Sequence, residues 1–135
     1  MANMKRFGYL DNGIFPGTVL FSCGNSYAEI IEEIRKSKEK YWEKGISTEE
    51  SFIDNGCSKA LHRTIIKGDR KINLYYIILN GWYKTDYDYV VLAHECLHIT
   101  QFFLSQVLER DREIEAEAYY HSHIMQQCLD LIRQE

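Results

Sequence analysis

Apolar residues recur along the chain at two different spacings, which predicts a mixture of strands and helices. Residues 7–24 combine β-forming residues with two turn signals, so we expect two short strands joined by a turn. The spacing becomes helical at Ser26, where Ser26 and Glu29 form a capping box. One long N-terminal helix is therefore expected to run to about Lys44 and to end at Gly45.

A β-hairpin is expected in the middle of the chain. Two apolar runs, 60–66 and 72–79, flank the turn sequence Lys67-Gly68-Asp69-Arg70. The second run is almost entirely β-branched, aromatic or aliphatic, which is typical of a strand with both faces covered. The polar stretch 47–56, which precedes the hairpin, has room for a short helical turn.

Two helices are expected to form the C-terminal third. Thr85 and Asp88 cap the first, whose interior from 89 to 108 carries no charge except Glu95. The second is expected over about 113–133, with one apolar face formed by Ile114, Ala118, Met125, Cys128 and Ile132. These elements predict a single α+β domain over residues 1–135, with a small antiparallel or mixed sheet and a C-terminal helix pair.

Composition limits the classes of partner. The chain has 135 residues, of which 45% are hydrophobic and 27% charged, enough for one compact domain without disulfide bonds. Its formal net charge is -4, and no stripe of Lys and Arg compensates for it locally. We therefore expect no nucleic-acid partner.

The sequence also bears on location. The first ten residues hold no apolar core of signal-peptide length, and the weakly charged run 89–108 contains a glutamate and two histidines, so we expect neither a cleaved leader nor a membrane span. The four cysteines form no CxxC pair, which predicts reduced, mostly buried thiols. These features predict a cytoplasmic protein of a bacterial or host cell, although a protein carried in a phage particle would share them.

The motif that carries chemistry is His94-Glu95-Cys96-Leu97-His98, which matches the pattern HExxH. On a helix, residues four apart lie one turn above another, so His94 and His98 present two imidazoles to one Zn²⁺ ion. Glu95 is offset by about 100° and lies beside the metal, where it can act as general base. An ionised Glu95 inside an uncharged helix is costly to bury without a cation or a hydrogen-bond network, so a buried polar network is the alternative to a metal site.

A catalytic zinc needs a further protein ligand. The position six residues after His98, where a third histidine would stand in one class of zinc peptidases, is Leu104. The last helix instead offers Glu113, Glu115 and Glu117, of which Glu113 is expected on a solvated face. Periodicity does not choose between Glu115 and Glu117.

The C-terminal half resembles short zincin-like metallopeptidases of phages and mobile elements, which combine HExxH with a bulky apolar helix and a Glu-x-x-Ala-Tyr element. Here that element is Glu115-Ala116-Glu117-Ala118-Tyr119. The resemblance implies a minimal zincin-like fold and a gluzincin-type site: His94 and His98 as zinc ligands, Glu95 as general base and Glu115 as third ligand. Glu117 stays as the alternative ligand, because the local repeat also permits a shifted register.

Further residues are candidates for contacts around the metal. Tyr119 and His121, with their neighbours Tyr120 and His123, are candidates to donate a hydrogen bond to a developing oxyanion or to contact substrate. Cys96 lies inside the motif but projects to the far side of the helix, so we expect it in the core.

These observations predict a zinc-dependent hydrolase, a metallopeptidase acting on a peptide or protein substrate. The strand 72–79 is the expected edge strand that aligns an extended peptide. The competing hypothesis is a non-enzymatic binding module of a phage or mobile element, in which zinc holds two helices together and the surface binds a host factor.

Overall fold

The fold is an α+β arrangement, with a four-stranded mixed sheet and helices on both of its faces. The structure is a computed structural model that describes residues 4–11, 18–37, 41–107 and 114–134. The strands lie in the order β1-β2-β4-β3, with β2 parallel to β4 and the other neighbouring pairs antiparallel. They are β1 (Arg6–Asp11), β2 (Thr18–Cys23), β3 (Lys59–Lys67) and β4 (Arg70–Leu79). The helices in the described ranges are α1 (Tyr27–Lys36), α2 (Tyr41–Gly45), α3 (Glu50–Asp54), α4 (Asp86–Val107) and α5 (Ile114–Ile132). The expected α+β class with a mixed sheet is confirmed.

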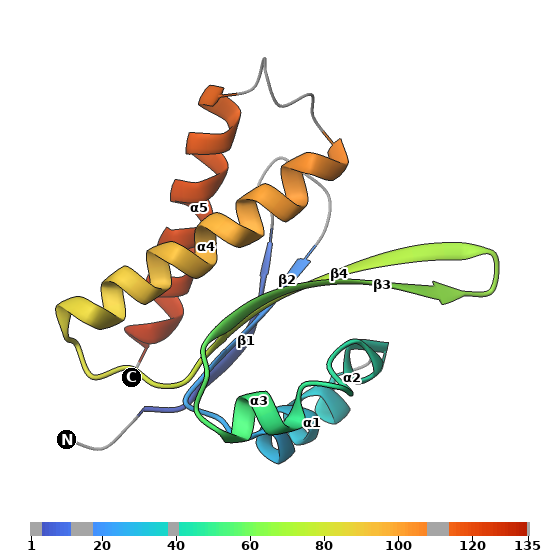
Figure 1. The fold of residues 1–135 in the computed structure, drawn as a ribbon, viewed down its shortest axis with the longest axis horizontal. Helices are drawn as coiled ribbons and strands as arrows, with labels where there is room; N and C mark the ends of the chain where they lie inside the picture. Colours follow the sequence, from blue (N-terminus) through green and yellow to red (C-terminus); the bar gives the residue numbers. More distant parts are fainter. Residues whose placement is uncertain (1–3, 12–17, 38–40, 108–113, 135) are drawn as a thin grey trace.

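The two groups of helices lie on opposite faces of the sheet, α4 and α5 on one and α1 to α3 on the other (Figure 1). Side chains of the central strands alternate between these layers. On β4, Tyr75 and Ile77 belong to the core beneath α4 and α5, whereas Tyr76 and Ile78 belong to the core beneath α1 to α3. A strand buried on both faces has no polar side, which explains the nearly continuous apolar run in the sequence.

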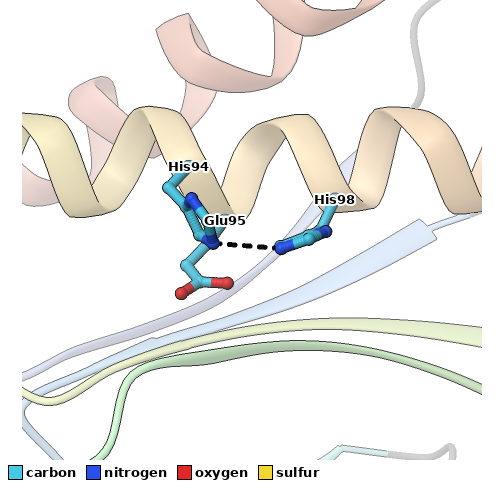
Figure 2. Close-up of side chains that lie close together, drawn as sticks. All are labelled: His94, Glu95 and His98. Atoms are coloured by element: carbon cyan, nitrogen blue, oxygen red, sulfur yellow. Dashed lines mark hydrogen bonds between the residues drawn. The ribbon is translucent and has the colours of Figure 1, made fainter.

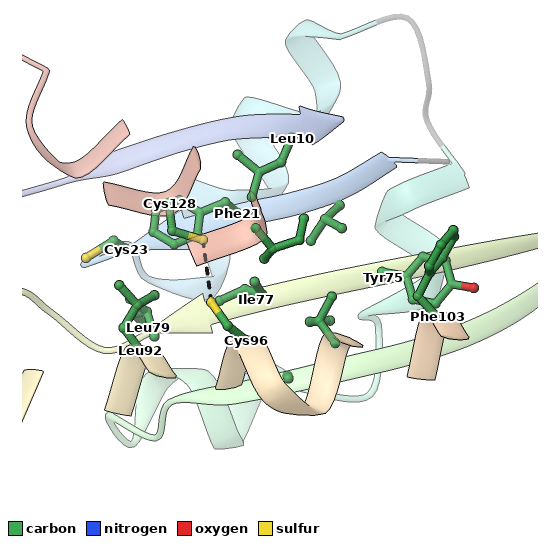
Figure 3. Close-up of a cluster of buried hydrophobic side chains, with 14 of the residues drawn as sticks. Leu10, Phe21, Cys23, Tyr75, Ile77, Leu79, Leu92, Cys96, Phe103 and Cys128 are labelled. Carbon is green, nitrogen blue, oxygen red and sulfur yellow. Dashed lines mark hydrogen bonds between the residues drawn. The ribbon is translucent and has the colours of Figure 1, made fainter. Parts of the chain in front are cut away.

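Aromatic rings and thiols close the core between α4, α5 and the sheet (Figure 3). The ring of Phe103 stacks on that of Tyr120, with centroids 4.9 Å apart. The Sγ atoms of Cys96 and Cys128 are 3.9 Å apart, and both residues are fully buried. All four cysteines are free, and Cys23 is buried as well, so the expectation of reduced, mostly buried thiols is confirmed. Burial raises the pKa of the Cys23 thiol to about 12, which keeps it protonated at neutral pH.

The expected long N-terminal helix is wrong, because α1 ends at Lys36. Its capping box at Ser26 is present as expected. At the other end, the backbone of Ser37 is extended and its hydroxyl donates to the carbonyl of Ile34 at 2.6 Å, which caps the helix. The short α2 then buries Trp42, whose ring meets that of Tyr76 edge-on and whose carbonyl accepts the Tyr76 hydroxyl at 2.8 Å. Tertiary packing around these two rings therefore replaces the helix that local periodicity favours.

The prediction that the strand 72–79 is covered on both faces is confirmed, but its expected role as the edge strand is wrong, because β4 lies inside the sheet between β2 and β3. The hairpin itself forms where expected, with Lys67 paired to Arg70 and Gly68 in the turn at a φ of 65°. Parallel pairing of β2 with β4 fills the second edge of β4. The edge strand on this side of the sheet is therefore β3.

The helix α4 begins at the expected capping box. The Thr85 hydroxyl accepts the N–H of Asp88 at 3.2 Å, and the Asp88 carboxylate accepts the N–H groups of Thr85 at 3.2 Å and Tyr83 at 2.7 Å. The uncharged run that follows packs against the sheet. Within the described ranges, no helix combines the length and the apolar character needed to span a bilayer.

Replacing Asp88 tests this cap. We expect Asp88→Ala to lower the free energy of unfolding by about 1–2 kcal/mol, because two backbone N–H groups lose their acceptor. Urea titration followed by circular dichroism measures the change. Asp86→Ala removes an exposed charge from the same helix end but leaves the cap, and it should cost about 0.5 kcal/mol. Equal losses in the two variants would assign the effect to helix-end charge and contradict a role for the cap.

Candidate metal centre

The helix α4 brings the two motif histidines together. The Nε2 atoms of His94 and His98 are 3.0 Å apart, and their rings are nearly perpendicular, at 83°. This is the expected result of a four-residue spacing on one face of a helix. His94 is exposed and His98 is half-buried, so the pair opens toward solvent.

Glu95 lies beside this pair. The ligand atoms of His94, Glu95 and His98 all lie within 4.8 Å of one another, and within the described ranges no other set of three His, Cys, Asp or Glu residues gathers in this way. In Figure 2 the three side chains leave α4 toward the strands, while α5 lies on the other side of α4. The sheet-facing side of α4 is therefore the candidate site.

The Glu95 carboxylate is held between α4 and the edge strand. The residue is only 8% exposed, and its carboxylate accepts a hydrogen bond from the backbone N–H of Ala60 on β3. Burial raises the pKa of the Glu95 carboxyl above its ordinary value, while the neighbouring His94 and His98 and the Ala60 N–H oppose that shift. A basic carboxylate beside two imidazoles is suited to accept a proton from water.

The geometry of the two histidines fits a metal ion. Two nitrogen ligands at ordinary zinc distances around a tetrahedral ion stand roughly 3.3 Å apart, close to the Nε2 separation seen here. Two imidazole nitrogens with a carboxylate oxygen are a donor set that zinc accepts. A direct hydrogen bond between the imidazoles would also give this separation, so geometry alone leaves the buried polar network as the alternative.

Of the two glutamates expected as third ligand, only Glu117 has a described side chain, and it is not a member of this group. Glu115 lies in the first turn of α5, but its side chain lies outside the described residues. Glu117 is half-buried and stands one helical turn before His121. The expected apolar face of α5 is confirmed at Met125, Cys128 and Ile132, but Ala118 is exposed, and Tyr120 with Ile124 lies in the core instead. Sequence periodicity could not detect this difference, because small and aromatic residues suit both faces.

The residues expected as oxyanion or substrate contacts lie on α5. The Nε2 of His121 donates to the carbonyl of Ala93 at 3.2 Å, which fastens α5 to α4. Tyr119 is 57% exposed and stacks on His123. His121 is not a member of the group of candidate metal ligands around Glu95.

Two strand residues near the site were not expected from the sequence. Ala60 contributes its backbone to Glu95, as described above. His62 lies two residues further along β3, where its ring stacks on Tyr75 and lies 6.1 Å from that of Phe102, which stacks in turn on His98. The hairpin pattern predicts the strand, but only the packing of α4 over β3 selects which of its residues reach the motif.

A cleft adjoins the motif at the N-terminal half of α4. Its volume is about 800 Å³, and its lining includes His94 and Glu95. The other walls are the turn between α3 and β3 and the loop from β4 to α4. A ligand in this cleft would lie beside the candidate metal ligands.

No protein-family model, curated protein or solved structure matches this chain.

Burial of Glu95 predicts a pH-dependent stability of the metal-free protein. A carboxyl whose pKa is higher when folded binds more protons in the folded state, so its contribution to stability is lost as pH rises from the ordinary glutamate range through its folded pKa. Glu95→Gln cannot ionise. We expect the metal-free variant to be more stable than the metal-free wild type at neutral pH, with the difference disappearing below about pH 4.

Thermal unfolding in the presence of a chelator, at neutral and acidic pH, measures this difference. Greater stability of the wild type at neutral pH would mean that the histidines and the Ala60 N–H stabilise the ionised carboxylate more than burial penalises it.

Proposed function

We propose that this chain is a zinc-dependent hydrolase, and more specifically a metallopeptidase, in which His94 and His98 bind the metal. The observation that carries the proposal is the convergence of two imidazoles and a buried carboxylate on the open, sheet-facing side of α4. The resemblance to short zincin-like peptidases supports the same class of reaction. It also supports a minimal zincin-like arrangement of the fold.

Each motif residue has a distinct role in this proposal. His94 and His98 would hold the zinc, which when bound would supply a Lewis acid for the peptide carbonyl and for a nearby water. Glu95 accepts the proton of that water and later returns a proton to the departing amine. The Ala60 N–H orients the Glu95 carboxylate, which keeps its basic oxygen in position.

We propose β3 as the strand that aligns the peptide, in place of the strand 72–79. Residues of an edge strand alternately direct their backbone groups toward the neighbouring strand and outward. The bond from Ala60 to Glu95 identifies Ala60 as outward, and His62 and Thr64 follow at the same period. A peptide paired with these groups would run beside His94 and His98.

For the third ligand we propose Glu115, as the resemblance implies, with Glu117 as the alternative. Both belong to the beginning of α5, which contacts α4. A site with three protein ligands leaves a position for water, as a catalytic zinc requires.

The alternative of a zinc-stabilised binding module has less support. The described contacts between α4 and α5 include a buried thiol pair and the stacked Phe103 and Tyr120 rings. These contacts hold the two helices together without a metal. Only a closed site with four protein ligands would favour a purely structural zinc.

Metal analysis tests the site. The wild type purified without added metal should hold about one zinc per chain by mass spectrometry, whereas His94→Ala and His98→Ala should lose it. His123→Ala is the matched control, because His123 bonds to Gln127 away from the motif, and it should keep zinc. Loss of zinc in only one of Glu115→Ala and Glu117→Ala names the third ligand. A wild type that takes up no zinc even when supplied would reduce the motif to a polar pair.

Peptide hydrolysis tests the mechanism. Glu95→Gln should keep its zinc but lose activity by a factor of about 100 or more, because the general base is gone. The assay compares cleavage of an unbiased peptide library by mass spectrometry, with and without a chelator. Undiminished turnover by the zinc-loaded variant would exclude Glu95 as the base.

A further inference from the structure

The cleft beside the motif has an unusual distribution of exposed apolar side chains. In the described part of the chain, eight large hydrophobic residues are exposed, and four of them line this cleft. They are Phe52, Tyr83, Tyr87 and Val90, which are 47%, 45%, 74% and 65% exposed. They come from α3, from the loop before α4 and from α4 itself. Exposed apolar surface gathered around a hollow is typical of a ligand-binding site.

The charge of the lining restricts the ligand. No Lys or Arg is among the described residues that line the cleft. The ammonium of Lys59 lies 4.3 Å from the centroid of the Phe52 ring, but it is paired with Glu49 at 2.6 Å, so an acidic side chain in the cleft would find no unpaired Lys or Arg among these residues. One of the two lining carboxylates, Asp88, already accepts the N–H groups of Tyr83 and Thr85. The other is Glu95, which the proposed reaction uses as base. The cleft therefore suits an uncharged group.

The cleft also lies on the path of a bound peptide. Its lining includes Cys57 and Ser58, which immediately precede β3, and His94 and Glu95. A peptide paired with the outward groups of β3 from Thr64 to Ala60 would pass the metal site and continue over this cleft. A volume of about 800 Å³ has room for a large side chain with part of the adjoining backbone.

We propose that this cleft is a substrate subsite that takes a large uncharged side chain, aromatic or branched aliphatic, from the residue next to the cleaved bond. The inference rests on the proposed peptidase function and adds the class of substrate. Phe52, Tyr87 and Val90 determine the specificity.

Binding of a small probe tests the subsite without requiring catalysis. Titration of the zinc-loaded wild type with N-acetyl-phenylalaninamide should shift the backbone amide signals of Gly56 and Gly81, which line the cleft. N-acetyl-alaninamide should leave these signals unshifted. So should the α-amide of N-acetyl-aspartate, which keeps its charged side-chain carboxylate. No shift with the phenylalanine probe, or equal shifts with all three, would overturn the proposal.

A charge placed in the cleft tests the specificity. Val90→Lys should weaken probe binding and lower kcat/KM for peptides with an aromatic residue next to the cleaved bond by on the order of tenfold or more, with unchanged zinc content. It should also raise the relative cleavage of peptides with Asp or Glu at that position. Glu32→Lys is the matched control: Glu32 is exposed on α1, which lies on the face of the sheet opposite α4, and this variant should behave as the wild type.

The two readouts separate this inference from the function on which it rests. Probe binding without any peptide cleavage would contradict the peptidase function but support an apolar binding site in the cleft. Cleavage without preference for large uncharged residues, and without probe binding at the two glycines, would keep the peptidase and remove the subsite.

Discussion

The packing of α4 against both α5 and the sheet is the interaction on which the rest of the structure depends. One stripe of this helix, containing Leu92, Cys96, Ile99 and Phe103, is buried in the core. The angle between this stripe and the one that carries His94 and His98 is set by the helical repeat. Once the apolar stripe is buried, the histidines have to face the edge of the sheet. The orientation of the candidate site is thus a consequence of core packing.

The same packing buries an acidic side chain, so its ionisation has a high free-energy cost. Glu95 is nearly buried and has one backbone donor from β3 together with two imidazoles. These partners offset part of the desolvation cost, and a divalent cation bound by the imidazoles would offset more of it. The arrangement therefore links metal binding to the charge state of the proposed base. In a site of this kind the metal-free protein is less stable, and the metal-bound protein gains a reactive base.

The strand order decides what a ligand can reach. Because β2 pairs in parallel with β4, the hairpin contributes β3 rather than β4 to the outer edge, next to the motif. The chain leaves β4 at the end where β3 begins, and α4 starts after a short loop. The cleft forms where these segments meet. An edge strand, a pair of imidazoles and an apolar cleft thereby come to lie side by side although they belong to separate segments of the sequence.

Local interactions determined much of this protein from its sequence alone. The capping boxes at Ser26 and Thr85, the hairpin turn at Gly68 and the convergence of His94 with His98 depend on residues only a few positions apart, whose geometry the backbone fixes. Only the tertiary structure decided the end of α1, the place of Tyr120 rather than Ala118 in the core, the edge position of β3 and the contact of Glu95 with Ala60. Each of these depends on which distant side chains share a core, as Trp42 does with Tyr76 and Cys96 with Cys128. Periodicity along the chain carries no information about such pairings, because it specifies which face of an element is apolar but not which element that face meets.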